Sequence, residues 1–200
     1  NTIIACAKHF AGYGFAEAGR DYNTVDVGTS TLYNTILPPF KAAVEAGVQT
    51  VMNSFNTLNG VPATGNKWLQ RDILKDAWKF NGFVVSDWGS GMEMIDHGFA
   101  ANLKQVAEQS ANAGSDMDME SYAYVNHLKE LVETGKVDIK LVDDAVRRIL
   151  RVKYKLGLFD DPYKFSNAAR EKAAMNNPAH MQAARDMAKK SIVLLKNENN

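Results

Sequence analysis

Four short apolar runs along the chain predict β-strands. They cover Thr2–Phe10, Val48–Asn53, Gly82–Ser86 and, more weakly, Ser115–Met119. The second and third runs are almost entirely apolar, which is typical of strands that are covered on both faces. The pattern therefore favours a parallel sheet over a set of hairpins.

Between these runs the apolar positions recur at helical spacing. Leu69, Ile73 and Ala77 repeat every four residues, which predicts a helix with one buried face. A later helix has clear end signals, because Asp138 can cap its start and Gly157 can end it in a left-handed conformation. The stripe expected to be buried on that helix consists of Val142, Val146, Ile149 and Leu150.

The alternation of strands and helices predicts an α/β fold built from right-handed βα units. A complete (β/α)₈ TIM-type barrel needs about 250 residues and eight strands. Because four strands are predicted here, residues 1–157 are expected to form the C-terminal half of such a barrel. A doubly wound sheet remains an alternative on pattern alone.

The character of the chain changes after residue 157. Residues 158–180 are polar and contain turn signals, so we expect a linker. Residues 181–200 are predicted to form the truncated start of a second α/β domain, with a helix followed by the strand Ser191–Leu195. The chain begins at Asn1 without a methionine or a signal peptide, and we interpret it as an internal fragment.

Composition and charge exclude several classes of partner. Lys plus Arg and Asp plus Glu both count 23, so the chain is formally neutral and has no basic stripe for nucleic acid. Its apolar runs are far shorter than the roughly 20 residues that span a bilayer, so no membrane partner is expected. Cys6 is the only cysteine, which excludes an internal disulfide.

Candidate chemistry lies where the predicted strands end. In parallel α/β proteins the carboxyl ends of the strands form the active site, and here they supply Lys8, His9, Phe55, Asp87 and Trp88. Charged groups that hydrogen-bond hydroxyls, together with aromatic faces, suit a sugar. On the residues alone, Asp87 is either a catalytic carboxylate or the N-cap of a helix that begins near residue 91.

Eight motifs occur in an order that resembles glycoside hydrolase family 3, and most of all its bacterial β-glucosidases. They are Lys8–Gly14, Gly19–Asp21, Leu37–Phe40, Met52–Asn56, Asn59–Pro62, Gly82–Trp88, Gly157–Phe159 and Ser191–Asn197. The resemblance implies a retaining enzyme that hydrolyses terminal non-reducing β-D-glucosyl residues of a glucoside or oligosaccharide. It implies no cofactor and no metal ion, and a periplasmic or secreted location.

The resemblance also implies roles for individual residues. Asp87 matches the family's nucleophile, which forms a covalent glycosyl-enzyme intermediate. Lys8 and His9 match residues that bind sugar hydroxyls. The acid/base carboxylate of the family comes from later in the chain, so the 200 residues alone are expected to be inactive. The positions that match the pocket lining are Trp88, Met52 and Phe55.

The segment around Lys8 and His9 has to depart from a regular strand. Adjacent strand residues point to opposite faces, so both side chains can reach one sugar only if the backbone changes direction. Members of the family have non-proline cis peptides in this segment. We therefore expect the Lys8–His9 bond or the Phe10–Ala11 bond to be cis.

Other members of the family and a non-catalytic barrel are the alternatives to a β-glucosidase. The family's N-acetylglucosaminidases carry an Asp-His pair after the Lys-His strand, and the absence of any histidine between His9 and His97 disfavours that branch. A β-xylosidase, a mixed-specificity enzyme and a non-catalytic carbohydrate-binding barrel remain open. Glu93 is either a solvated residue in the first turn of a helix or a group near the aglycone.

Overall fold

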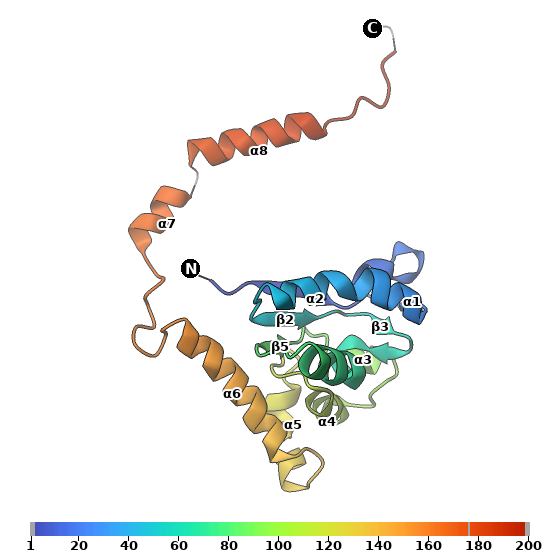
Figure 1. The fold of residues 1–200 in the computed structure, drawn as a ribbon. Coiled ribbons are helices and arrows are strands. Elements are labelled where there is room, and N and C mark those ends of the chain that lie inside the picture. Colours follow the sequence, from blue (N-terminus) through green and yellow to red (C-terminus); the bar gives the residue numbers. More distant parts are fainter. Residues whose placement is uncertain (1–2, 176, 199–200) are drawn as a thin grey trace. The chain divides into compact units, whose positions relative to one another are not determined.

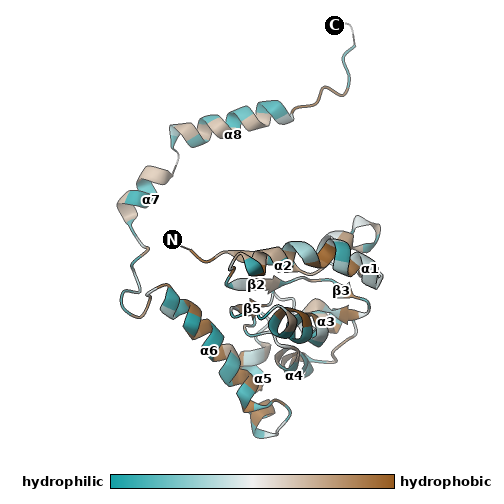
Figure 2. Cartoon of the chain, in the orientation of Figure 1, coloured by the Kyte–Doolittle hydropathy of each residue, from teal (hydrophilic) through white to brown (hydrophobic). Residues whose placement is uncertain are grey.

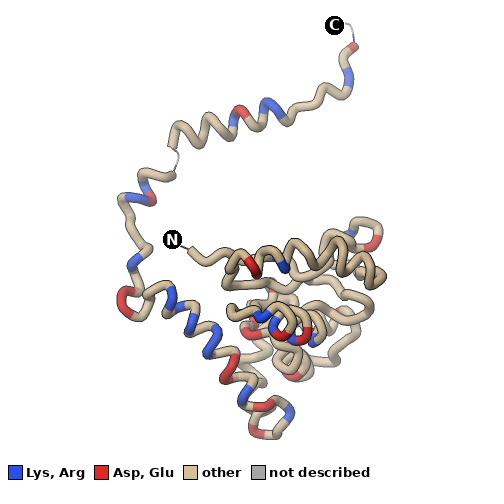
Figure 3. Tube along the Cα trace, in the orientation of Figure 1, with Lys and Arg blue, Asp and Glu red and all other residues tan. Residues whose placement is uncertain are grey.

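A computed structural model describes residues 3–175 and 177–198 of the protein (Figure 1). The chain divides into two compact units, one ending at Phe159 and the other beginning at Asp160. Charges of both signs are interspersed along the chain (Figure 3), and no helix in the described residues is both long and apolar enough to cross a membrane.

The first unit is built on a three-stranded parallel sheet. Its strands are β1 (Cys6–Phe10), β2 (Thr50–Asn53) and β5 (Phe83–Val85), in the order β1-β2-β5. The prediction of a parallel sheet is confirmed. The fourth predicted run contributes a single parallel bridge, between Val85 and Met117, rather than a full strand. A separate antiparallel pair is formed by β3 (Thr57–Leu58) and β4 (Val61–Pro62).

Helices connect the strands of this unit, as the pattern predicts. The α-helices are α1 (Thr29–Thr31), α2 (Leu37–Glu45), α3 (Glu93–Asp96), α4 (Leu103–Ala113), α5 (Ala123–Glu133) and α6 (Ile139–Lys155). The π-helices are η3 (Leu32–Ile36) and η5 (Trp68–Ala77), and 3-10 turns lie at η1 (Tyr13–Phe15), η2 (Glu17–Gly19) and η4 (Ala63–Gly65).

Two apolar clusters hold the unit together. The first joins the sheet to η3, α2 and η5, with Phe10, Val51 and Val84 of the strands packed beside Leu69 and Leu74. The second lies among α3, α4 and α5. Of the helical stripe predicted from residue 69, Leu69 and Ile73 are buried on η5, but the expected burial of Ala77 is wrong because that residue is exposed.

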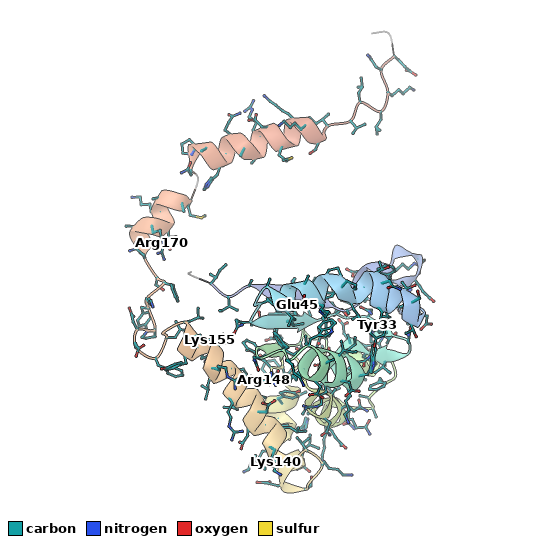
Figure 4. All side chains as sticks on the ribbon, in the orientation of Figure 1. Tyr33, Glu45, Lys140, Arg148, Lys155 and Arg170 are labelled. Carbon is teal, nitrogen blue, oxygen red and sulfur yellow. The ribbon has the colours of Figure 1, made fainter. Side chains whose placement is uncertain are left out.

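Close packing also fixes the start of β5. A Cβ atom at Gly82 would lie 2.0 Å from the carbonyl oxygen of Gln49, so only glycine fits there. Arg148 of α6 donates hydrogen bonds from its guanidinium group to the carbonyl oxygens of Phe80 (2.8 Å) and Gly82 (2.9 Å) (Figure 4). The loop that leads into β5 is therefore held on two sides.

Helix α6 begins and ends as the sequence predicts, but part of its stripe is exposed. The carboxylate of Asp138 accepts the Lys140 N–H at 2.9 Å, and Gly157 has a φ of 72°. The expected burial of Val146 and Leu150 is wrong, since both are exposed on α6, along which hydrophilic and hydrophobic residues alternate (Figure 2).

The second unit contains two helices and no strand in its described residues. Helix α7 (Ala168–Ala174) lies inside the predicted linker, and α8 (Pro178–Ser191) includes the helix expected at 181–190. The strand predicted at Ser191–Leu195 is wrong, because residues 192–197 have no regular structure. An extended apolar run becomes a strand only beside another strand, and none of the described residues provides one. The linker and the second domain stay predictions.

Candidate active site

Asp87 lies at the carboxyl end of the sheet, two residues beyond the last residue of β5. Its side chain is largely buried, and its Oδ1 atom accepts the Trp88 N–H at 2.7 Å. Helix α3 begins at Glu93 with Met92 at its N-cap position, so the interpretation of Asp87 as a helix cap is wrong. The carboxylate instead approaches His9 of β1, the strand on the far side of β2 in the sheet.

The side chain of His9, on β1, lies close to the second carboxylate oxygen of Asp87. Its Nε2 atom lies 3.1 Å from Oδ2 of Asp87. The ring nitrogen is not aligned for a hydrogen bond, and Oδ2 is a buried oxygen without a hydrogen-bond partner in the described chain. The carboxylate therefore has one oxygen fixed by the backbone and one oxygen available for chemistry.

Electrostatics favour a neutral imidazole at this position. Burial and the neighbouring Lys8 ammonium lower the pKa of His9, while Asp87 and Asp21 act in the opposite direction. At neutral pH the imidazole ring that contacts Asp87 is thus uncharged. A neutral imidazole can both donate and accept a hydrogen bond, as recognition of a hydroxyl group requires.

The backbone at His9 has the expected irregularity. Both the Lys8–His9 and the Phe10–Ala11 peptide bonds are cis, and the register between β1 and β2 shifts between Ala7 and Phe10. Lys8 and His9 line one groove of about 360 Å³ that extends along Tyr13 toward α2. The expectation of a cis peptide bond in this segment is confirmed, whereas the binding of one sugar by both side chains stays a prediction.

The other predicted pocket residues lie at the same end of the sheet. Trp88 is 64% exposed beside Asp87. Met52 is paired with Val85 across the β2–β5 register, one strand from the nucleophile candidate. Phe55 follows β2 and packs its ring 4.6 Å from that of Tyr22. Their role in binding a sugar stays a prediction.

Two tyrosines of the site were missed by the sequence reasoning. Tyr13 makes an edge-on contact with His9, with ring centroids 5.2 Å apart, and it lies 5.8 Å from Phe55. Burial and a hydrogen bond to Asp21 raise the pKa of its hydroxyl. The signal for Tyr13 was its place in the Lys8–Gly14 motif, whereas nothing local identified Tyr22.

Glu93 is the second carboxyl group near Asp87. Burial raises its pKa to about 7, and the carboxylates of Asp96, Asp87 and Asp21 add to the effect. The group therefore exchanges its proton near neutral pH. The interpretation of Glu93 as an ordinary solvated helix residue does not account for this burial, and a role near the aglycone stays a prediction.

Glu93→Gln is expected to raise the thermal midpoint of the intact protein above about pH 7 and to leave it unchanged below about pH 4.5. Across this window the unfolded carboxyl group ionises while the folded one keeps its proton, so the folded state loses stability as pH rises. Measuring the thermal midpoints of the wild-type protein and the variant across this pH range tests the prediction. Glu171→Gln, on the exposed face of α7, is the matched control, and an equal pH response in both variants would contradict the assignment.

A metal site is not indicated. The described residues contain no group of three or more His, Cys, Asp or Glu side chains that could hold a metal ion.

Comparison with known proteins identifies the family. Residues 1–152 match the model of the glycosyl hydrolase family 3 N-terminal domain. The chain belongs to glycosyl hydrolase family 3. Its first unit accordingly has the TIM-barrel-like α/β fold of that domain, which agrees with the predicted fold class at this level.

Several family 3 relatives resemble nearly the whole chain. It is 42% identical over 199 residues to a periplasmic β-glucosidase of Salmonella typhimurium, covering 98% of this chain and 26% of that protein. It is 40% identical over 210 residues to a β-xylosidase of Formosa agariphila, covering 100% of this chain and 29% of that protein. The chain thus spans about a quarter of the length of these relatives.

A solved structure agrees with this family assignment. The β-glucosidase of Listeria innocua in complex with glucose superposes with a TM-score of 0.87 at 45% identity, covering 99% of this chain and 27% of that one.

Proposed function

We propose that the protein containing this chain is a retaining β-glucosidase, with Asp87 as its nucleophile. The observation that carries the proposal is the state of the Asp87 carboxylate. One oxygen is fixed by the Trp88 N–H, and the other is buried beside a neutral His9, with no hydrogen-bond partner among the residues that the structure describes. The substrate class follows from the family 3 relatives, several of which are named β-glucosidases.

The reaction then takes two steps. Oδ2 of Asp87 attacks the anomeric carbon as its bond to the aglycone oxygen breaks, and that oxygen takes a proton from a carboxylic acid supplied by another part of the protein. Water next attacks the same carbon and gives a proton to that carboxylate. The bond to Oδ2 breaks, which releases glucose with its β configuration and frees Asp87.

The remaining site residues bind the sugar in this proposal. Lys8 donates from its ammonium group and His9 from its neutral ring to hydroxyls of the terminal glucosyl unit. Trp88, Met52 and Phe55 cover the apolar side of the ring. An aspartate-to-alanine mutant of the Listeria innocua enzyme has been solved with laminaribiose, which supports a β-linked glucose disaccharide as the kind of substrate.

A β-xylosidase is the second candidate, because family 3 relatives with that name are 40% and 35% identical to this chain. Glucose differs from xylose by its hydroxymethyl group. The preference for one sugar over the other therefore depends on whether the site has space for that group on the sugar ring. A carbohydrate-binding barrel without catalysis is the third candidate, and the intact Asp87 site argues against it.

The domain assignment belongs to the same proposal. Residues 1–157 form the second half of the catalytic barrel, residues 158–180 a linker, and residues 181–200 the start of a second α/β domain. The two open sides of the half barrel are then β1 at one edge and the apolar face of α6 at the other. The Salmonella typhimurium relative, named as periplasmic, supports a periplasmic or secreted location.

Covalent labelling tests the assignment of Asp87. The intact protein is incubated with an activated 2-fluoro glucoside or, in parallel, a 2-fluoro xyloside, and the labelled peptide is identified by mass spectrometry. We expect one glucosyl adduct on the peptide that contains Asp87, because the fluorine slows hydrolysis of the intermediate. A faster reaction with the xyloside favours a β-xylosidase, and a label on another carboxylate contradicts the nucleophile assignment.

A further inference from the structure

The turn that carries Asp87 is held at both ends by the backbone of one residue, Met119. The Met119 N–H donates to Oγ of Ser86 at 2.7 Å, on the near side of the nucleophile candidate. The Met119 carbonyl accepts the Gly89 N–H at 2.8 Å, on its far side. Residues 86–89 and Met119 therefore form a closed ring of contacts around Asp87.

The Met119 N–H lies just beyond the last bridge between β5 and the segment around Met117. There the hydroxyl of Ser86, rather than a backbone carbonyl, accepts its hydrogen bond. The Ser86 N–H still donates to the Met117 carbonyl at 2.9 Å, next to the isolated bridge between Val85 and Met117. Beyond this bridge the chain turns away through Gly89, which has a φ of 66°. The partly buried Met119 N–H needs an acceptor, and the buried Ser86 side chain supplies it.

The position of the reactive oxygen depends on this ring. Within the described residues Oδ2 of Asp87 accepts no hydrogen bond, and Oδ1 is bonded to the N–H of Trp88, a member of the same turn. The carboxylate thus moves with the backbone of residues 86–89. Any change in the anchoring of that backbone is transmitted to the oxygen that attacks the sugar.

We propose that Ser86 is a positioning residue for the nucleophile, acting through the hydrogen bond that its hydroxyl accepts from the Met119 N–H. The inference rests on the proposed function of Asp87 and adds a residue that does not touch the substrate. A misplacement of about 1 Å in a reacting group lowers the rate of chemistry by about 100-fold while ground-state binding is little affected.

The test uses the variants Ser86→Ala and Ser86→Thr in the intact protein. Two quantities are measured below the unfolding temperature of each variant: the rate of labelling of Asp87 by the 2-fluoro glucoside, and the dissociation constant of glucose. Ser86→Ala is expected to lower the labelling rate by about 10- to 100-fold and to leave glucose binding unchanged. Ser86→Thr keeps the hydroxyl and is expected to restore the labelling rate.

Ser90→Ala is the matched control, because Ser90 is a buried serine whose Oγ bonds Thr64 Oγ at 2.9 Å outside the ring. If the wild-type protein is not labelled at Asp87, the proposed function fails. If it is labelled, three results overturn the role of Ser86 alone. These are labelling of Ser86→Ala as fast as that of Ser90→Ala, an equal loss of labelling and glucose binding, and no restoration by Ser86→Thr.

Discussion

Asp87→Ala is expected to lower the turnover of an aryl β-glucoside by the intact protein by at least about 10⁴-fold, while glucose still binds. Removing the nucleophile of a covalent mechanism typically costs several powers of ten, because no remaining group can form the intermediate. The residues expected to bind sugar hydroxyls, Lys8 and His9, are unchanged in this variant. Steady-state kinetics and calorimetric titration with glucose measure the two effects.

Added azide gives this prediction a stereochemical signature. In Asp87→Ala the small anion can occupy the space of the lost carboxylate, and its nitrogen can form the bond to the anomeric carbon as the aglycone leaves. The product is then an α-glucosyl azide, which proton NMR distinguishes from the β anomer. Asp96→Ala, a nearby exposed carboxylate on α3, is the control and should keep wild-type turnover. A β-glucosyl azide would instead identify Asp87 as the acid/base.

Lys75→Met is expected to destabilise the first unit by about 3–5 kcal/mol, because it leaves a buried carboxylate without its partner. The Lys75 ammonium lies 2.6 Å from Oδ1 of Asp116, and both side chains are 4% exposed. It also donates to the carbonyl of Gly114 at 2.8 Å, while Oδ2 of Asp116 accepts the Val84 N–H at 2.8 Å. The pair thus ties η5 and the segment after α4 to strand β5.

A double variant separates the charge effect from general damage. Lys75→Met combined with Asp116→Asn removes both charges and keeps an oxygen for the Val84 N–H, so we expect it to unfold at a higher temperature than Lys75→Met alone. Lys41→Met breaks the exposed pair with Glu45 and should cost less than about 1 kcal/mol. Scanning calorimetry of the intact protein measures all three. A loss for Lys75→Met no larger than for Lys41→Met would contradict the prediction.

Local signals predicted local structure well. The Asp138 cap and the left-handed Gly157 depend on a few neighbouring residues, and both are present. The strand expected at Ser191–Leu195 depends on a distant partner, which an apolar run cannot specify. For the same reason the stripe of α6 was predicted to be buried without any means of identifying what would cover it.

The site shows the same division between local and distant information. Strand-end positions and ordered motifs nominated Asp87 and His9, yet only the fold brings these residues, 78 positions apart, within 3.1 Å. The sequence pattern identified neither Lys75 nor Asp116 as a buried ion pair, because their burial results from packing among three distant segments. Ser86 was part of a quoted motif, but the role of its hydroxyl as an acceptor for the Met119 N–H is visible only in the folded chain.

The ring around Asp87 uses the peptide group of Met119 and none of its side-chain atoms. Replacing that methionine with any L-residue except proline, which lacks the N–H donor, changes the side chain at this position while both anchoring hydrogen bonds persist. Natural variation at this position is therefore free to reshape the surface next to the reaction centre without disturbing the attacking group. A library of substitutions at residue 119 is therefore a way to search for variants with altered sugar preference and an unchanged rate of the chemical step.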